Sequence, residues 1–160
     1  MTDFDRLLRV LADSQTEFIL VGGVAAAVHG SARATYDIDI VYARTRENVD
    51  RLVSALRPLE PYLRGAPPGL PFSWESPTLL RGLNFTLTTT AGDIDLLGEI
   101  TGGGTFNDLV ADTEIIEVFG VKCLCLSLER LIAVKRAAGR PKDLEMIAEL
   151  EAIAEERKGV

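Results

Sequence analysis

Two acids alternate with apolar residues in Arg33-Ala34-Thr35-Tyr36-Asp37-Ile38-Asp39-Ile40-Val41. The alternation predicts a strand, in which side chains two apart share a face with Cα atoms about 6.5 Å apart. Ile38 and Ile40 would then face the core, and Asp37 and Asp39 would lie side by side. Two neighbouring carboxylates in apolar surroundings are costly unless a positive charge lies between them. The stretch therefore predicts half of a site for a divalent cation; the alternative is an edge strand with both acids in solvent.

A second alternation of acids and apolar residues occurs in Gly92-Asp93-Ile94-Asp95-Leu96-Leu97. If this strand neighbours the first, Asp95 or Asp93 can supply the third carboxylate that two magnesium ions would need. Asp95 is the preferred candidate because apolar residues enclose it. Asp93 follows a turn glycine and can instead lie in solvent at a hairpin.

Two glycines stand between a predicted strand and a predicted helix in Leu20-Val21-Gly22-Gly23-Val24-Ala25. Glycine lets the backbone approach a ligand, and the N–H groups at a helix N-terminus favour a phosphate. A tight turn from strand to helix can also use glycine without any ligand. The spacing matches neither the P-loop nor the dinucleotide-binding fingerprint.

Basic residues gather near the end of the chain, with Lys135-Arg136 closing one predicted helix and Lys142 opening the next. Basic groups at a helix C-terminus are stabilising through the helix dipole and need no further function. The functional alternative places Lys135 or Lys142 on a triphosphate. His29 is the only histidine; it could contact substrate, but a role in satisfying backbone groups at a helix end is preferred.

The whole chain predicts an α/β (α+β) fold, a small mixed sheet flanked by helices, as a single domain over residues 1–160 with a helical C-terminal part at about 127–157. Proline punctuates residues 58–77, which also contain Trp74, so this stretch is a candidate lid or rim loop. The expected strands are 18–21, the acid-bearing strand, 83–89, 93–97, 115–119 and 121–126; the expected helices are 4–11, 24–28, 49–56, 127–138 and 141–157.

Composition limits the function. The chain has 160 residues, 47% of them hydrophobic, and a net charge of −7, which argues against a broad basic surface for duplex nucleic acid. The longest apolar run, Phe18 to Val28, is too short to cross a membrane, and an acidic N-terminus favours the cytoplasm. Cys123 and Cys125 have no second cysteine pair with which to complete a zinc site, so buried apolar positions are expected for them.

Taken together, Gly22-Gly23, the Asp37-Ile38-Asp39 pair and the later Asp95 resemble the signature of the DNA polymerase β-like nucleotidyltransferase superfamily. More narrowly, the chain resembles small bacterial nucleotidyltransferases that include toxins of type IV toxin–antitoxin systems. The further motifs that carry this resemblance are Val21-Gly22-Gly23-Val24-Ala25, His29-Gly30-Ser31-Ala32-Arg33-Ala34-Thr35, Lys135 and Gly139-Arg140-Pro141-Lys142-Asp143.

The resemblance implies transfer of a nucleotide from a nucleoside triphosphate that is bound through two Mg²⁺ (or Mn²⁺) ions. An acceptor hydroxyl would attack the α-phosphate and pyrophosphate would leave. By the same resemblance, Asp37 and Asp39 hold both metals and Asp95 completes the site near the attacking hydroxyl. The β- and γ-phosphates would lie at Gly22 and Gly23. Residues implied close by are Ser31 or Arg33, and many members of the superfamily have serine where this chain has Gly23.

Three other functions are open at this stage. A metal-dependent glycosyltransferase also uses an Asp-x-Asp pair, but it needs a larger domain before the pair than the 36 residues available. An inactive nucleotide-binding or protein-interaction module of the same fold is the stronger alternative. The chain could also act as a toxin whose main partner is an antitoxin protein. The acceptor is open between RNA, a protein and a small molecule; a tRNA end would need only a local basic patch, for which the candidates are Arg33, Lys135, Arg136, Arg140 and Lys142.

Overall fold

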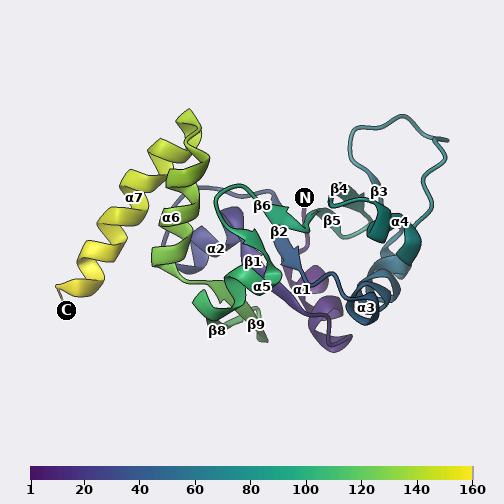
Figure 1. Cartoon of the computed structure of the whole chain (residues 1–160), viewed down its shortest axis with the longest axis horizontal. Helices are drawn as coiled ribbons and strands as arrows, with labels where there is room; N and C mark the ends of the chain where they lie inside the picture. Colours follow the sequence, from purple (N-terminus) through teal and green to yellow (C-terminus); the bar gives the residue numbers. More distant parts are fainter. Residues whose placement is uncertain (160) are drawn as a thin grey trace.

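The computed structural model describes residues 1–159, in which helices surround a seven-stranded mixed sheet (Figure 1). Val160, the last position of the expected domain, lies outside the described residues. This architecture confirms the α/β fold class that the alternation of strand and helix patterns predicts. The strands are β1 (Phe18–Val21), β2 (Asp37–Tyr42), β3 (Tyr62–Leu63), β4 (Asn84–Thr89), β5 (Gly92–Leu97), β6 (Glu99–Ile100), β7 (Gly104–Thr105), β8 (Thr113–Val118) and β9 (Val121–Leu126).

Five helices lie within a few residues of their expected positions, whereas the short helices at Ser76–Arg81 and Phe106–Leu109 were not predicted from the sequence. Figure 1 shows α6 and α7 at one end of the molecule and α3 and α4 at the other. The helices of the described chain are α1 (Phe4–Asp13), α2 (Gly22–Val28), α3 (Arg46–Leu56), α4 (Ser76–Arg81), α5 (Phe106–Leu109), α6 (Leu128–Ala138) and α7 (Pro141–Lys158), with short 3-10 turns η1 (Arg57–Leu59) and η2 (Val110–Asp112).

The sheet has the strand order β3-β4-β5-β2-β1-β9-β8, with β6 and β7 forming a separate two-stranded ribbon. Strand β2 pairs antiparallel with β1 and parallel with β5. The β4–β5 and β8–β9 pairs are antiparallel hairpins, as their short connections predict. In the parallel β2–β5 pair, residues that lie opposite each other in the register have their side chains next to each other on the same face of the sheet.

Helix starts are set by side chains that the sequence identifies. Asp3, Thr45 and Ser127 each accept a hydrogen bond from a backbone N–H three residues later, which caps α1, α3 and α6. The apolar stripe of α1 is completely buried at Leu7, Leu8 and Leu11. Capping and amphipathic periodicity are local signals, and for this reason these helices could be predicted from the sequence.

The proline-rich stretch, a candidate lid or rim loop, does not line the cavity. Among the described residues, none from 58 to 77 lines the cavity between the sheet and the α6–α7 pair. Trp74 is 8% exposed and donates from its indole N–H to the carbonyl of Val53 on α3, at 2.9 Å. The long connection between β3 and α4 lies at the end of the molecule opposite α6 and α7 (Figure 1). The hydrogen bond from Trp74 to α3 holds this stretch at that end of the molecule.

Both cysteines are buried, as the sequence predicts. Cys123 and Cys125 are buried free thiols on β9, and burial raises the pKa of Cys123 to about 11 and that of Cys125 to about 12. Over residues 1–159, the helices lack the length and apolar character that a bilayer crossing demands.

Candidate active site

Three carboxylates converge where β2 and β5 lie side by side. The parallel register sets Asp37 opposite Asp93 and Asp39 opposite Asp95. One oxygen atom from each of Asp37, Asp39 and Asp95 lies within 4.8 Å of the other two. The isoleucines that alternate with the acids on β2 are completely buried. The strand therefore presents apolar side chains to the core and carboxylates to the opposite face, as its alternation predicts.

The carboxylates are held in surroundings that disfavour their negative charge. Burial, reinforced by the charges of Asp37 and Asp95, raises the pKa of Asp39 to about 8, while the Lys135 ammonium acts in the opposite direction. Burial and the charge of Asp95 also raise the pKa of Asp37, against the opposing effect of Arg64. Oδ1 of Asp39 is buried and has no hydrogen-bond partner among residues 1–159.

This donor set fits a hard divalent cation. Carboxylate oxygens are the ligands that Mg²⁺ and Mn²⁺ prefer. A cation among Asp37, Asp39 and Asp95 would offset the repulsion between these acids, and it would lower the raised pKa values of Asp37 and Asp39. The unpartnered oxygen of Asp39 is the observation in this structure that favours such an ion.

Arg64 is a member of the site that the sequence did not identify. Its guanidinium lies 2.8 Å from Asp95, 3.4 Å from Asp93 and 3.5 Å from Asp37. No local pattern marks it, because it reaches the site only through the pairing of β3 with β4 and of β4 with β5. Asp93 pairs with Arg64 and is outside the group of three converging carboxylates, which contains Asp95.

The two glycines make room for the carboxylate face. Gly22 has a φ of +65°, and a Cβ atom there would lie 2.0 Å from Oδ2 of Asp39. A Cβ atom on Gly23 would lie 2.7 Å from the hydroxyl oxygen of Thr35. A serine at position 23 would therefore collide with Thr35. The Thr35 hydroxyl, which donates to the carbonyl of Asp37 at 3.2 Å, takes that space instead.

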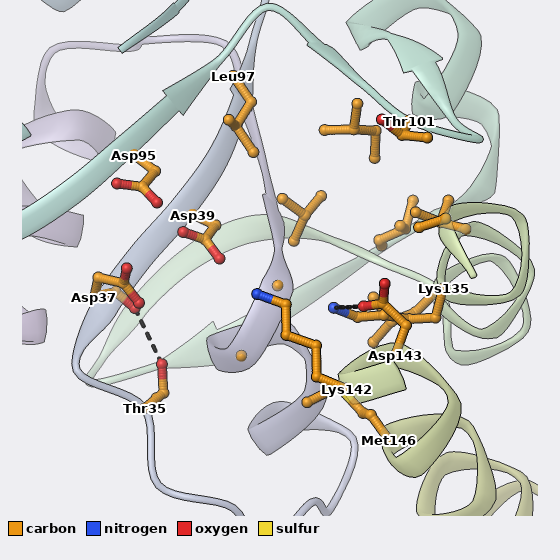
Figure 2. A pocket seen from close by; sticks show the side chains of 18 of the residues that line it. Thr35, Asp37, Asp39, Asp95, Leu97, Thr101, Lys135, Lys142, Asp143 and Met146 are labelled. Atoms are coloured by element: carbon orange, nitrogen blue, oxygen red, sulfur yellow. Dashed lines mark hydrogen bonds and ion pairs between the residues drawn. The ribbon is translucent and has the colours of Figure 1, made fainter. Parts of the chain in front are cut away.

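Helices α6 and α7 supply a basic wall that faces the carboxylates (Figure 2). Nζ of Lys135 lies 3.5 Å from Oδ1 of Asp143, a carboxylate whose side chain is only 1% exposed. Nε of Arg140 donates to the other oxygen of Asp143 at 2.6 Å. The side chain of Lys142 points into the cavity from the first turn of α7 (Figure 2).

Asp143 is a second residue whose role the sequence did not reveal. It stands three residues after Arg140, and its carboxylate accepts from both the backbone N–H and the guanidinium of Arg140. An acid in the first turn of a helix is a local signal that could have predicted this pairing. Its contact with Lys135 arises only from the packing of α6 against α7. The buried acid orients the Lys135 ammonium at the cavity wall.

Ser31 and Arg33 are held by α7. The Ser31 hydroxyl donates to Glu149 at 2.6 Å and is not among the described residues that line the cavity. Arg33 lies 3.7 Å from Glu149 and 4.0 Å from Glu145, and it does line the cavity. Of this pair, the structure therefore brings only Arg33 to the candidate site.

His29 has the structural role that was preferred for it. The ring is 4% exposed, and its Nε2–H donates to the carbonyl of Leu126 at 2.7 Å. Its Nδ1 accepts a hydrogen bond from Arg157 at 3.1 Å. The ring links the end of α2 to β9 and α7 and so satisfies a backbone group on a neighbouring strand.

The carboxylate face and the basic wall enclose a cavity of about 930 Å³. This volume lies in the range of small-molecule sites. The sequence-predicted residues that line it are Gly22, Gly23, Arg33, Asp37, Asp39, Asp95, Lys135 and Lys142. Residues separated by more than a hundred positions thus meet around one space.

The mixed sheet and the helices around it form a nucleotidyltransferase-like fold, as comparison with a solved structure shows. The chain is similar in structure to a Thermotoga maritima protein, known from a crystal structure and provisionally named a nucleotidyltransferase. The two share 18% identity with a TM-score of 0.58, over 93% of this chain and 94% of the other. No protein-family model matches the sequence, and no curated protein does. At this identity the likeness establishes the fold alone.

Proposed function

We propose that this protein is a metal-dependent nucleotidyltransferase, which transfers a nucleoside monophosphate from a nucleoside triphosphate to an acceptor hydroxyl and releases pyrophosphate. The observation that carries this proposal is the placement of opposite charges across one cavity. Asp37, Asp39 and Asp95 offer oxygens within 4.8 Å of one another on one side, and Lys135 and Lys142 line the other.

Asp37, Asp39 and Asp95 would hold the metal, as two Mg²⁺ or Mn²⁺ ions. When bound, such ions neutralise phosphate charge and hold the attacking and leaving oxygens in place. The three carboxylates lie on a rigid sheet, which favours a precise geometry for these ligands.

The residues around the metal ligands are suited to a triphosphate. Lys135 and Lys142 would contact the β- and γ-phosphates, and Arg33 adds a third positive charge at the cavity. The turn at Gly22 and Gly23 would let the phosphates approach the backbone N–H groups. Phosphoryl-type transfer depends on such positioning and charge neutralisation more than on covalent help from the protein.

At phosphorus the reaction forms one bond and breaks one bond. The acceptor oxygen bonds to the α-phosphorus and gives up its proton to the Asp95 carboxylate or to solvent, while the bond from that phosphorus to the bridging oxygen of the β-phosphate breaks and pyrophosphate leaves. Asp95, on β5, would lie next to the attacking hydroxyl. The acceptor is RNA, a protein or a small molecule.

A first experiment tests the metal site. Calorimetry with a nucleoside triphosphate in Mg²⁺ or Mn²⁺ should detect metal-dependent binding, and Asp37→Ala/Asp39→Ala should weaken it by about a hundredfold or more. The exposed Asp13→Ala, which removes one charge at the end of α1, should bind like the parent chain. Nucleotide binding that persists in the double variant would refute the proposal.

A second experiment separates an enzyme from an inactive module of the same fold. The protein is incubated with α-labelled triphosphates and a cell extract, and the label is followed into RNA, protein and small molecules. Transfer names the acceptor class. Metal-dependent binding without transfer would favour the inactive module.

The resemblance also supports a role as the toxin of a toxin–antitoxin pair, with a second protein as antitoxin. Expression of this chain alone should then arrest growth, and co-expression of the product of the neighbouring gene should restore it. Normal growth in both cases would remove this role and leave the enzymatic proposal unchanged.

A further inference from the structure

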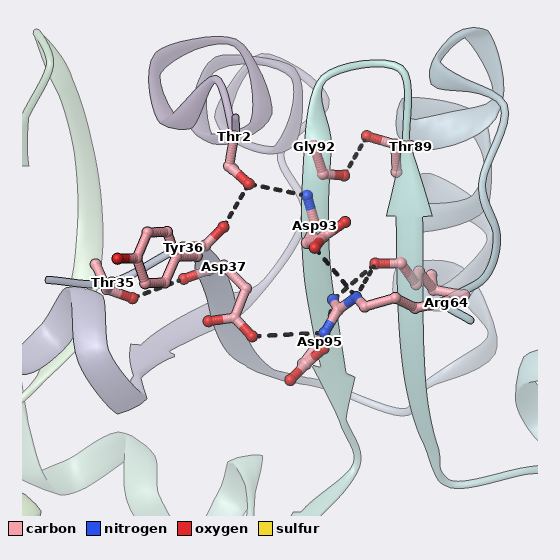
Figure 3. A network of polar contacts seen from close by, with 10 residues as sticks. Thr2, Thr35, Tyr36, Asp37, Arg64, Thr89, Gly92, Asp93 and Asp95 are labelled. Carbon is pink, nitrogen blue, oxygen red and sulfur yellow. Dashed lines mark hydrogen bonds and ion pairs between the residues drawn. The ribbon is translucent and has the colours of Figure 1, made fainter.

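Four aspartates, not three, lie together on the carboxylate face. The parallel register of β2 and β5 sets Asp37 beside Asp93 and Asp39 beside Asp95. Like charges directly opposite each other on neighbouring strands are destabilising. Arg64 makes ion pairs with three of the four, at 2.8 to 3.5 Å (Figure 3).

The position of Arg64 does not depend on these carboxylates alone. Its backbone N–H donates to the carbonyl of Thr86 on β4 at 3.0 Å. Its Nε and Nη2 donate to the carbonyl of Leu87, at 3.2 and 2.7 Å. The side chain is 26% exposed. The guanidinium is therefore fixed to β4 and held against the aspartates by the sheet.

Arg64 forms ion pairs with only two of the three proposed metal ligands. It contacts Oδ2 of Asp37 and Oδ1 of Asp95. Asp39, by contrast, keeps an oxygen that no donor within residues 1–159 contacts. Two of the three proposed ligands thus already share a cation that belongs to the protein.

We propose that Arg64 is a built-in competitor of the metal, which keeps metal affinity low until a nucleoside triphosphate arrives. A divalent ion bound by Asp37 and Asp95 would lie close to the guanidinium and be repelled by it. The triphosphate brings negative charge that offsets this repulsion, so metal and nucleotide bind together better than either alone. This inference rests on the proposed function only in taking Asp37, Asp39 and Asp95 as the metal ligands.

The test measures Mn²⁺ binding to the nucleotide-free chain by calorimetry. Arg64→Gln, which keeps a donor for the Leu87 carbonyl, should bind Mn²⁺ about tenfold more tightly than the parent chain. Arg136→Ala is the control for net charge, because it removes the same charge from an exposed side chain paired with Glu151; its Mn²⁺ affinity should stay within about twofold of the parent value. Unchanged or weaker binding in Arg64→Gln would overturn the proposal, since the guanidinium would then only position the carboxylates.

The effect of a triphosphate on Mn²⁺ affinity gives a second test. A non-hydrolysable triphosphate should raise the Mn²⁺ affinity of the parent chain more than that of Arg64→Gln, because the variant has no repulsion left to offset. Equal enhancement in both chains contradicts the inference. If Arg64→Gln fails to fold without metal, recovery of a cooperative thermal transition on adding Mn²⁺ supports it, and failure to recover overturns it.

The two proposals fail in different ways. If the parent chain binds Mn²⁺ and Asp37→Ala/Asp39→Ala does not, the metal site stands whatever Arg64→Gln shows. If Mn²⁺ binding is independent of these aspartates, the proposed function itself is lost.

Discussion

The two walls of the cavity differ in whether the protein itself neutralises their charged groups. The strand wall is the carboxylate face on β2 and β5, and the helical wall is the basic wall on α6 and α7. On the helical wall, Asp143 is 1% exposed and receives both Arg140 and Lys135. On the strand wall, Asp39 is half-buried, its pKa is raised to about 8, and one of its oxygens has no partner among the described residues. The helical wall is complete within the protein, whereas the strand wall becomes complete only with added positive charge. Such a locally unfavourable arrangement, supported by the surrounding fold, is typical of a binding site.

Among changes that affect only one wall, Gly22→Ala is expected to cause the largest loss of nucleotide affinity. A Cβ atom at this position would stand 2.0 Å from Oδ2 of Asp39, and the φ of +65° is unfavourable for alanine. The strand wall would be displaced while the helical wall stays intact. Metal-dependent nucleotide affinity, measured by calorimetry, should fall by about a hundredfold or more.

The control for Gly22→Ala is Gly139→Ala, because Gly139 has a nearly identical φ of +66°. There the nearest atom to an added Cβ, the carbonyl oxygen of Arg136, is 3.7 Å away. This variant carries the backbone strain without displacing Asp39 and should keep nucleotide affinity. Equal losses in both variants would attribute the effect to strain alone.

A smaller effect is expected in the stability of the metal-free protein as a function of pH. The pKa of Asp39 in the folded chain, about 8, lies above its ordinary value of 3.8. The folded chain therefore binds this proton more tightly than the unfolded chain does, and stability falls as pH rises between the two values. Between about pH 6 and pH 8 the loss from this group is about 2 kcal/mol at most.

Asp39→Asn should remove that loss, since the amide does not ionise. Denaturant unfolding in the presence of a chelator should show a flatter pH dependence than the parent chain, and higher stability at the alkaline end. Asp13→Asn, an exposed carboxylate at the end of α1, is the matched control and should follow the parent curve. A parent curve that rises with pH over this range would contradict the assignment of Asp39 as a destabilised acid.

The smallest effect concerns the basic wall alone. Lys142→Ala should weaken metal-dependent binding of a nucleoside triphosphate by about tenfold, the size expected for one charge-assisted contact. Mn²⁺ binding in the absence of nucleotide should not weaken, because the carboxylates are untouched. Lys158→Ala removes an exposed charge at the other end of α7 and should change neither measurement. Loss of Mn²⁺ binding in Lys142→Ala would show that the two walls are not separate.

Much of the strand wall could be predicted from the sequence. The alternation around Asp37 and Asp39 identifies a strand with one apolar and one acidic face, because side chains alternate at period two. The preference for Asp95 over Asp93 rested on neighbouring apolar residues, and Asp95 is the one that joins the converging carboxylates. Arg64 could not be found in the same way, because it follows the two-residue strand β3, and nothing in this stretch of sequence indicates that β3 pairs with β4.

The sequence alone determined five helices, the six longer strands and the candidate metal ligands, because caps, periodicity and acid–apolar alternation act over a few residues. It did not indicate the short elements α4, α5, β3, β6 and β7. It correctly favoured a structural His29, and the structure brings Lys135 and Lys142 to the cavity wall. Only the tertiary structure decided that β2 and β5 are parallel neighbours in register, that Arg64 stands among the aspartates, and that Ser31 is held by Glu149. Those choices depend on contacts between residues far apart in the chain, where packing and the pairing of buried charges outweigh local preference.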